Sequence, residues 1–332
     1  MILSRKEKRR LLKRFEKSSA VRSSKLLIEE KTITLEIPDN DQVASRIEEK
    51  LLSIENIFDG IDEKTSEFEV SELVTDVLMY DFLDPLLNDE EFPVISSSYI
   101  PLPECREFVI ERGDLCFRIR EDYGSLEKNI EGFTLNDFWN PPKEFTSIGR
   151  LNKENDPVLY VAEDILTACK EMKFSKESQG YLNVYRATQR ISLRYIGYES
   201  EEKLYKIMRR LFIEEINLPE TYKYKLTQEI ANRFFPYDPY DMDGWAYPSI
   251  ANRGNKHSAA IDLSKKDKLE LLGSLKFKVI SKEEILVNHV VIPKNDSPFF
   301  ITNMNNYPFG SFSLTKLNDV INLLINLNKK NI

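Results

Sequence analysis

Glycine is sparse in this chain, and its spacing excludes whole classes of fold. The eleven glycines never lie closer than eight positions apart, and Gly124 and Gly132 are the nearest pair. Neither G-x-G-x-x-G nor G-x-x-x-x-G-K can therefore occur, and these are the loops that bring backbone N–H groups against a phosphate in dinucleotide-binding and P-loop proteins. The sequence excludes both of these phosphate-binding architectures.

Histidine and cysteine are also few, which limits the metal chemistry. His257 and His289 are the only histidines, and no C-x-x-C pair connects the three cysteines, Cys105, Cys116 and Cys169. These counts exclude a His/Cys zinc site and an H-E-x-x-H helix, and we expect no metal cofactor. An odd number of scattered cysteines indicates reduced thiols rather than a disulfide framework.

Charge is distributed unevenly along the chain. Residues 1–31 carry eleven Lys and Arg against four Asp and Glu, so this segment is +7 and the rest is −15, for a total of −8. We expect the basic segment to be a mobile tail or a solvated helix, with an arm for nucleic acid or an acidic partner as the alternative. The acidic remainder argues against nucleic-acid binding elsewhere, because phosphate affinity needs positive charge.

The apolar residues are sufficient for a core but not for a membrane span. Hydrophobic residues make up 41% of the 332, which suits a folded protein. No apolar run reaches the roughly 18 residues that cross a bilayer. The first residues, MILSRKEKRRLLKRFEK, place charges where a signal peptide needs an apolar stretch. We therefore expect a cytoplasmic protein that does not bind membranes.

The hydrophobic pattern predicts a helical N-terminal part followed by a mixed sheet. Apolar residues recur at helical spacing over 40–58 and 70–83. From about residue 109 short strands dominate, at 115–120, 156–162, 245–250, 258–263, 272–280 and 284–293. Further helices are expected at 164–174, 200–216, 220–234 and 314–328. Because strands outnumber crossover helices, the fold class is α+β rather than a doubly wound parallel sheet.

Two kinds of charged group within these elements could carry chemistry. In LCFRIR (115–120) the alternation places Arg118 and Arg120 on one face, where their guanidinium forks suit a pyrophosphate or a carboxylate. Two solvent-exposed strand arginines are the alternative. Glu171 lies at the edge of the apolar stripe of helix 164–174, where its carboxylate could stabilise positive charge at a sugar carbon. A solvated helix glutamate is the alternative.

Three further residues are weaker candidates. Tyr160 lies near the end of a strand that leads into this helix, where it could line a site or pack in the core. Ser249 follows Tyr247 and Pro248, and could donate a hydrogen bond to a ligand or stabilise the strand end. His257 comes eight residues later, but no G-x-S-x-G surrounds the serine, which argues against a serine hydrolase.

Longer stretches of the sequence resemble the RES-domain family. GRLNKENDPVLYVAEDILTACKEM (149–172) is similar to its Gly-Arg-x-Asn turn, Val-Leu-Tyr-x-Ala strand and Glu-bearing helix, with Arg150, Tyr160 and Glu171 at the family's spacing. CFRIRE resembles its Phe/Tyr-Arg-x-Arg strand, and YKLTQEIANRFFPYDPYDMDGWAYPSI resembles its Tyr-x-x-Thr-Gln helix and Asp-Gly-x-x-Tyr-x-Ser strand. The Arg, Glu and Ser for which the family is named map to Arg118, Glu171 and Ser249, within a resemblance that covers about 115–265.

The resemblance implies an ADP-ribosyltransferase-like fold with NAD+ as the substrate. Known RES-domain members are toxins that cleave NAD+ by hydrolysis or phosphorolysis, often beside a DNA-binding antitoxin. The residues that the resemblance assigns to NAD+ binding are Arg118 and Arg120, at the pyrophosphate, and Tyr160 and Tyr247.

The resemblance also implies a catalytic set, which consists of Arg118, Arg150, Tyr160, Glu171 and Ser249. Glu171 would hydrogen-bond the ribose and stabilise an oxocarbenium-like transition state as nicotinamide leaves. Arg150 would orient Glu171 or bind phosphate, and Ser249 would fix the nicotinamide or the ribose.

The chain departs from the family in length and in the Gly-Gly-Arg-Trp-Asn motif, which reads Ile148-Gly149-Arg150-Leu151-Asn152 here. Leu151 replaces the Trp of the common Gly-Gly-Arg-Trp-Asn form, and about 110 residues precede the resemblance. We divide the chain into a basic tail (1–31), a helical N-terminal subdomain (32–108), a RES-like catalytic domain (109–280) and a C-terminal strand and helix extension (281–332).

The extensions and the acceptor leave alternatives open. The added segments could replace an antitoxin, drive self-association or sense a trigger. The reaction could also be ADP-ribosylation of a macromolecule. A third alternative is a degenerate RES domain that serves as a binding module, against which the intact set of site residues argues.

Overall fold

The computed structural model describes residues 25–28, 31–34, 56, 58–81, 99–101, 106–121, 134–172, 177–216, 220–236, 241–281, 284–294, 297–301, 310–313, 321–322 and 324–326. Contacts within the chain define two compact units. The first comprises Met1–Cys105, Glu199–Met208 and Ile216–Phe234, and the second comprises Arg106–Tyr198, Arg209–Glu215 and Phe235–Ile332. The domain boundaries drawn from the sequence stay predictions.

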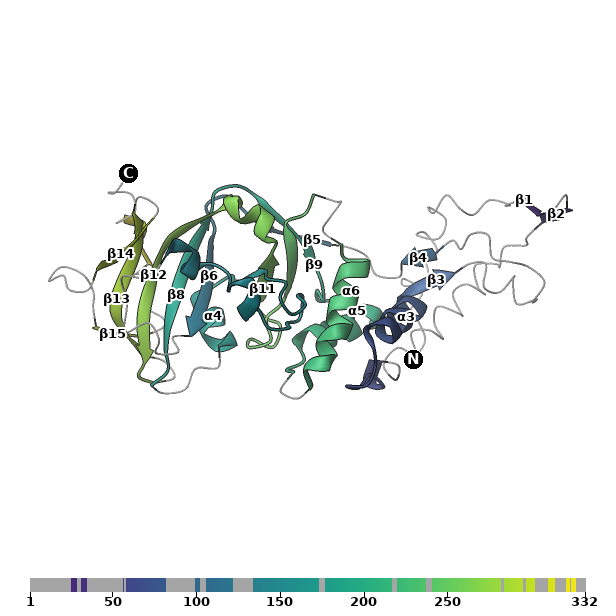
Figure 1. The fold of residues 1–332 in the computed structure, drawn as a ribbon, viewed down its shortest axis with the longest axis horizontal. Coiled ribbons are helices and arrows are strands. Elements are labelled where there is room, and N and C mark those ends of the chain that lie inside the picture. The colour runs from purple at the N-terminus through teal and green to yellow at the C-terminus, as the bar shows by residue number, and fades with distance from the viewer. Residues whose placement is uncertain are drawn as a thin grey trace. The chain divides into compact units, whose positions relative to one another are not determined.

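The second unit is built on one sheet of eleven strands. In chain order these are β5 (Arg106–Ile110), β6 (Leu115–Glu121), β7 (Leu159–Ala162), β8 (Gln179–Ala187), β9 (Ile191–Tyr195), β10 (Gly244–Pro248), β11 (His257–Ile261), β12 (Leu269–Val279), β13 (Glu284–Lys294), β14 (Ser297–Ile301) and β15 (Gly310–Ser313). Their spatial order is β14-β13-β12-β8-β6-β7-β11-β10-β9-β5, with β15 also paired to β13 (Figure 1). Only β9 and β10 run parallel among the described pairs.

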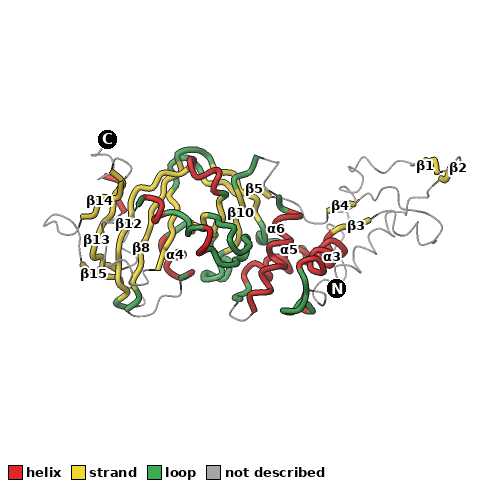
Figure 2. The backbone as a smooth tube through the Cα atoms, viewed as in Figure 1, coloured by secondary structure: helices red, strands yellow, loops and turns green. Residues whose placement is uncertain are grey.

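Short helices lie between these strands along the chain. They are α4 (Ile165–Glu171), α5 (Lys203–Ile213), α6 (Tyr224–Phe234) and the 3-10 turns η3 (Leu135–Phe138), η4 (Lys143–Phe145), η5 (Glu220–Lys223) and η6 (Leu263–Lys268). Of these, α6, η5 and the first half of α5 belong to the first unit. Figure 2 shows α4 in red against the yellow strands near β8. Strands that are mostly antiparallel, with helices between some of them, confirm the α+β class.

Alternation along β6 divides its side chains between two hydrophobic clusters. Phe117 and Ile119 pack in one cluster with α4, whereas Cys116 packs in the other cluster with the strands that follow. The neighbouring strand β8 is buried on both faces: Val184 belongs to the first cluster and Tyr185 to the second. The centre of the sheet therefore forms the core, and polar groups that project from β6 come to lie beside it.

β6 and β7 separate almost as soon as they meet. Phe117 and Ala162 are the one residue pair that joins them in the described residues. β6 nevertheless continues alongside β8 as far as Glu121, and β7 pairs along its whole length with β11. Each strand is thus held by its other neighbour while the two diverge, which creates an opening in the middle of the sheet.

The described part of the first unit contains a helix pair. α3 (Glu67–Leu78) starts with a capping box, in which the Ser66 N–H donates to Glu69 and the Glu69 N–H donates back to the Ser66 hydroxyl. Arg233 of α6 donates to the hydroxyl of Ser71 at 2.6 Å. The described residues of this unit also form two short hairpins, β1 (Lys25–Ile28) with β2 (Lys31–Thr34) and β3 (Met79–Asp81) with β4 (Tyr99–Pro101).

Most predicted elements are present with shifted ends. The helix predicted over 70–83 begins earlier, at Glu67, because the capping box fixes its start. Its predicted end was wrong: the helix ends at Leu78, because Met79–Asp81 forms β3. The strand predicted over 156–162 begins only at Leu159. In the basic tail, the described residues Lys25–Ile28 form a strand where we expected a tail or a helix.

Some predictions fall on parts of the chain that the structure does not describe. The helix over 40–58 lies outside the described residues except near its end, and the helix over 314–328 is described only at 321–322 and 324–326. In the residues that are described, none of the helices has the length and apolar character needed to cross a membrane.

Candidate functional site

A cavity of about 230 Å³ lies where β6 and β7 diverge. Its walls come from both strands, from α4 and from the strands β10 and β11. Four predicted site residues line it: Arg118, Tyr160, Glu171 and Tyr247. Residues that are far apart in the sequence therefore meet in one cleft, at the opening that the two strands leave.

Glu171 is the last residue of α4 and is half-buried. Asp164 fixes the start of this helix by accepting a hydrogen bond from the Thr167 N–H at 2.8 Å. At the other end, Oε1 of Glu171 accepts hydrogen bonds from Ser249 Oγ at 2.6 Å and from Ser258 Oγ at 3.3 Å. Both serines are buried. Two hydroxyls on one oxygen fix the orientation of the carboxylate in the cleft.

The turn before β7 positions Tyr160. Its hydroxyl donates to Asn152 Oδ1 at 2.9 Å and accepts from the Leu151 N–H at 3.1 Å. Gly149 is needed there, because a Cβ would lie 2.4 Å from Asn152 Oδ1. The ring of Tyr160 meets that of Tyr247 edge-on, with 6.5 Å between the centroids. The Gly-Arg-x-Asn turn therefore determines the position of the Tyr160 ring in the cleft.

Arg118 places a positive charge in the same cleft. Its guanidinium donates to the backbone oxygen of Trp139 at 2.5 Å. Loss of solvation on burial lowers the pKa of Arg118, but an arginine pKa starts so far above neutrality that the group stays charged. A partly buried guanidinium with several donors can bind an anionic group strongly.

Tyr247 remains protonated at neutral pH. Burial raises the pKa of Tyr247 well above its ordinary value of 10.0, and the negative charge of Glu171 raises it further, while the charge of Arg150 opposes this. The phenol can therefore act in the cleft only as a neutral aromatic group with a hydroxyl.

Two predicted arginines do not line the cavity. Arg120 donates to the backbone oxygen of Asp137 at 2.5 Å. Arg150 is buried and donates to the carbonyl oxygens of Leu211 and Glu214, at 2.6 Å each, at the C-terminal end of α5. The predicted roles of Arg120 at a pyrophosphate and of Arg150 at Glu171 stay predictions.

The cleft residues belong to a segment with a family match. Residues 117–269 match the family model described as the RES domain. The chain contains a RES domain. The resemblance found in the sequence is thereby confirmed, and all seven predicted site residues lie inside the matched segment. No curated protein and no solved structure matches the chain. The ADP-ribosyltransferase-like part of the fold prediction stays a prediction.

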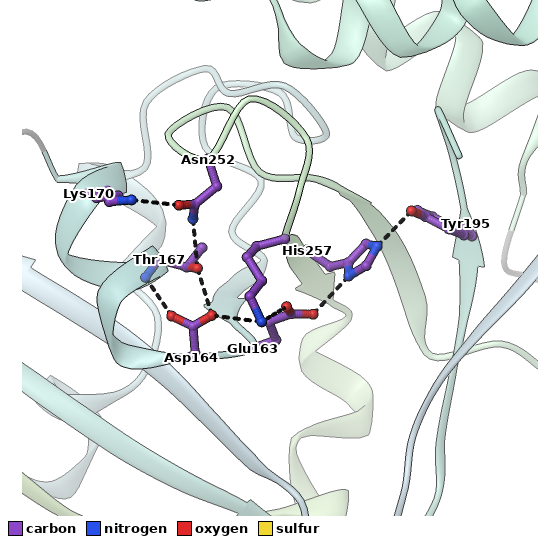
Figure 3. Close-up of polar contacts among 8 residues, drawn as sticks. Glu163, Asp164, Thr167, Lys170, Tyr195, Asn252 and His257 are labelled. Atoms are coloured by element: carbon purple, nitrogen blue, oxygen red, sulfur yellow. Dashed lines mark hydrogen bonds and ion pairs between the residues drawn. The ribbon is translucent and has the colours of Figure 1, made fainter. Parts of the chain in front are cut away.

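A second cavity of about 440 Å³ adjoins the cleft of the RES domain. The two cavities share Phe117, Val161, Ala162 and Ser258 in their walls. The polar lining of the second cavity includes a histidine–glutamate pair: His257 Nδ1 lies 2.8 Å from Glu163 Oε2, and His257 Nε2 lies 2.7 Å from the Tyr195 hydroxyl (Figure 3). Because a carboxylate only accepts, the neutral ring carries its proton on Nδ1 and accepts from Tyr195.

Three residues of the RES domain that contact the site were not predicted. Asn152 belongs to the Gly-Arg-x-Asn turn and could have been found from that motif. No motif in the sequence indicated Ser258, because its contact with Glu171 depends on the pairing of β11 with β7. Asn252 lies in the loop after Ser249 and contacts α4. Across the described residues, no group of three His, Cys, Asp or Glu side chains is placed to hold a metal ion.

Proposed function

We propose that this RES domain cleaves the nicotinamide–ribose bond of NAD+, by hydrolysis or phosphorolysis. The observation that supports this most is the carboxylate of Glu171, which two buried serine hydroxyls hold in a cleft that Arg118, Tyr160 and Tyr247 also line. An oriented anion beside a cation and two aromatic rings matches what a dinucleotide with a cationic pyridinium requires.

Each group in the cleft has a role in this proposal. Arg118 binds the pyrophosphate, because its fork suits phosphate oxygens. The rings of Tyr160 and Tyr247 contact nicotinamide or ribose. Glu171 stabilises the positive charge that develops on the ribose carbon as nicotinamide departs with the bonding electron pair. Water or phosphate then bonds to that carbon, and water releases a proton in the process.

The adjoining cavity favours a second candidate, transfer of ADP-ribose to a larger acceptor. A volume of about 440 Å³ falls in the range that binds organic ligands, and it is more than a water molecule needs. Product analysis separates the candidates: hydrolysis gives ADP-ribose, phosphorolysis gives its phosphate ester, and transfer gives a modified acceptor.

In a cell, consumption of NAD+ would arrest growth. We therefore propose that the protein acts as a toxin or a defence effector, and that an antitoxin or self-association through the segments outside the matched residues restrains it. Inducing the active protein should deplete NAD+, and inducing an inactive variant should not.

The test is nicotinamide release from NAD+ by the purified full chain, followed by chromatography. Glu171→Gln keeps the volume of the side chain but removes the charge, so release should fall about a hundred- to a thousandfold, roughly 3–4 kcal/mol, while NAD+ binding persists. Glu154→Gln, at an exposed turn outside the cleft, is the matched control and should retain wild-type release. A folded wild type that releases no nicotinamide would refute the proposal.

A further inference from the structure

Ser249 belongs to a loop, residues 249–256, whose two ends are joined by a backbone hydrogen bond. The Ser249 N–H donates to the Lys256 carbonyl at 2.7 Å, and the Gly254 N–H donates to the Ser249 carbonyl at 2.8 Å. Both backbone groups of the serine are therefore held by the same loop that carries it. The position of its hydroxyl on Glu171 depends on where the whole loop lies relative to α4.

Asn252 attaches the middle of this 249–256 loop to α4. Its Nδ2 donates to Thr167 Oγ1 at 2.8 Å, and its Oδ1 accepts from Lys170 Nζ at 2.9 Å (Figure 3). These partners allow only one orientation of the amide, because an ammonium group cannot accept and the Thr167 hydroxyl donates its proton to Asp164 at 3.0 Å. The asparagine is thus fixed at both ends.

The end of the loop is attached to the start of α4 by charged groups. Lys256 Nζ lies 3.1 Å from Glu163 Oε1 and 3.6 Å from Asp164 Oδ2. The next residue, His257, bonds to the second oxygen of Glu163. Lys256 is exposed, and an exposed ion pair contributes little stability. Arg209 also holds this loop, because its guanidinium donates to the Gly254 carbonyl at 2.7 Å. Asn252 is the side chain that ties the middle of the loop to α4 by two hydrogen bonds.

We infer that Asn252 is a positioning residue, which acts through Ser249 to orient the carboxylate of Glu171. The inference rests on the proposed function, since the orientation matters only if Glu171 acts on a substrate. Asn252 contacts α4, and Glu171 ends that same helix. The loop and the helix are therefore joined by the contacts of Asn252 as well as by the Ser249–Glu171 hydrogen bond.

The decisive experiment is a double-mutant cycle on nicotinamide release, with Asn252→Ala, Ser249→Ala and the double variant. Asn252→Ala should lower kcat about tenfold, the value of one hydrogen bond in the transition state, and leave KM within about twofold. Because Asn252 acts through Ser249, the double variant should be no slower than Ser249→Ala alone. Multiplying effects, or an unchanged kcat in Asn252→Ala, would overturn the inference.

Two further variants test the chemistry of the contact. Asn252→Asp keeps an acceptor for Lys170 but faces Thr167 with an oxygen that cannot donate, so it should be as slow as Asn252→Ala. Asn255→Ala, which truncates an exposed asparagine of the same loop, should match the wild type. Wild-type rates in Asn252→Asp would show that the hydrogen bond to Thr167 does not position the loop, and would overturn the inference.

Hydrogen exchange provides a readout that needs no turnover. The amides of Ser249 and Gly254 should exchange faster in Asn252→Ala than in the wild type or Asn255→Ala, because the loop would open more often. If the wild type releases no nicotinamide, the proposed function fails and this measurement alone decides whether Asn252 holds the loop. Unchanged exchange of both amides would overturn the positioning role.

Discussion

Ser249 Oγ lies 2.6 Å from Glu171 Oε1, although 78 positions separate the two residues in the chain. One comes from the loop after β10 and the other from the last turn of α4. Ser258 of β11 adds a second, longer hydrogen bond to the same oxygen. The carboxylate is therefore oriented by two separate segments, and its chemistry should depend on both.

Removing the shorter hydrogen bond should cost more activity. We expect Ser249→Ala to lower kcat about tenfold or more and Ser258→Ala to lower it about threefold, because the bond to Ser249 is 0.7 Å shorter than the 3.3 Å bond to Ser258. Steady-state kinetics of nicotinamide release measures both. In a Glu171→Gln background neither change should slow release further; additional losses would mean that the serines act independently of the carboxylate.

Arg118 and Arg120 should differ, although both project from one face of β6. Arg118 lines the cleft, whereas Arg120 does not line it and pairs with Asp137. We expect Arg118→Met to weaken NAD+ binding about tenfold or more and Arg120→Met to change it less than about threefold. Titration calorimetry in the Glu171→Gln background measures binding without turnover. Equal losses would instead support the sequence-based prediction that both arginines hold the pyrophosphate.

Arg150 should matter for stability. Its replacement by Met leaves two carbonyl oxygens at the end of α5 without their charged donor, which should cost about 2–4 kcal/mol of unfolding free energy. Urea unfolding followed by the fluorescence of Trp139 and Trp245 reports on the same compact unit. The exposed Arg112→Met is the control. A stable Arg150→Met protein that has lost only activity would instead assign this residue to the site.

Two thiols, the buried Cys116 and the half-buried Cys169, predict how the unfolding free energy changes in alkali. Burial raises the pKa of Cys116 and of Cys169 to about 12, from an ordinary 9.0. The folded protein thus keeps both thiols protonated where the unfolded chain ionises them, so their contribution is complete below about pH 9 and declines as pH rises toward 12. Unfolding free energies between pH 8 and 11 should fall less steeply in a Cys116→Ala, Cys169→Ala variant than in the wild type. Parallel curves would contradict the raised pKa values.

Local sequence patterns predicted the cleft residues because the direction of each side chain is determined by the strand or helix that carries it. Alternation in 115–120 was sufficient to place Arg118 on the face opposite Phe117, and helical spacing placed Glu171 at the edge of its apolar stripe. The spacing of the family motif then placed Tyr160 in the same predicted site. For these positions, sequence periodicity carries most of the information, since a strand and a short helix leave few orientations open.

The features that could not be predicted from the sequence depend on contacts between segments that are far apart in the chain. β8 was not predicted, because it is buried on both faces and lacks the alternation of a half-buried strand. Arg150 donates to carbonyls 61 and 64 positions away, so nothing near it in the sequence indicates its partners. The contact of Ser258 with Glu171 likewise follows only from the order β7-β11 in the sheet.

The single residue pair between β6 and β7 has a consequence for inhibitors. Because β8 and β11 hold these strands from outside, the spacing of the opening is set by backbone ladders, and a ligand that enters between the strands need not bend them apart. A rigid, planar compound that matches this width would lose little conformational entropy on binding. Conversely, substitutions that added backbone pairs between β6 and β7 should narrow the cleft and lower the proposed release of nicotinamide, although they would replace none of the residues that line it.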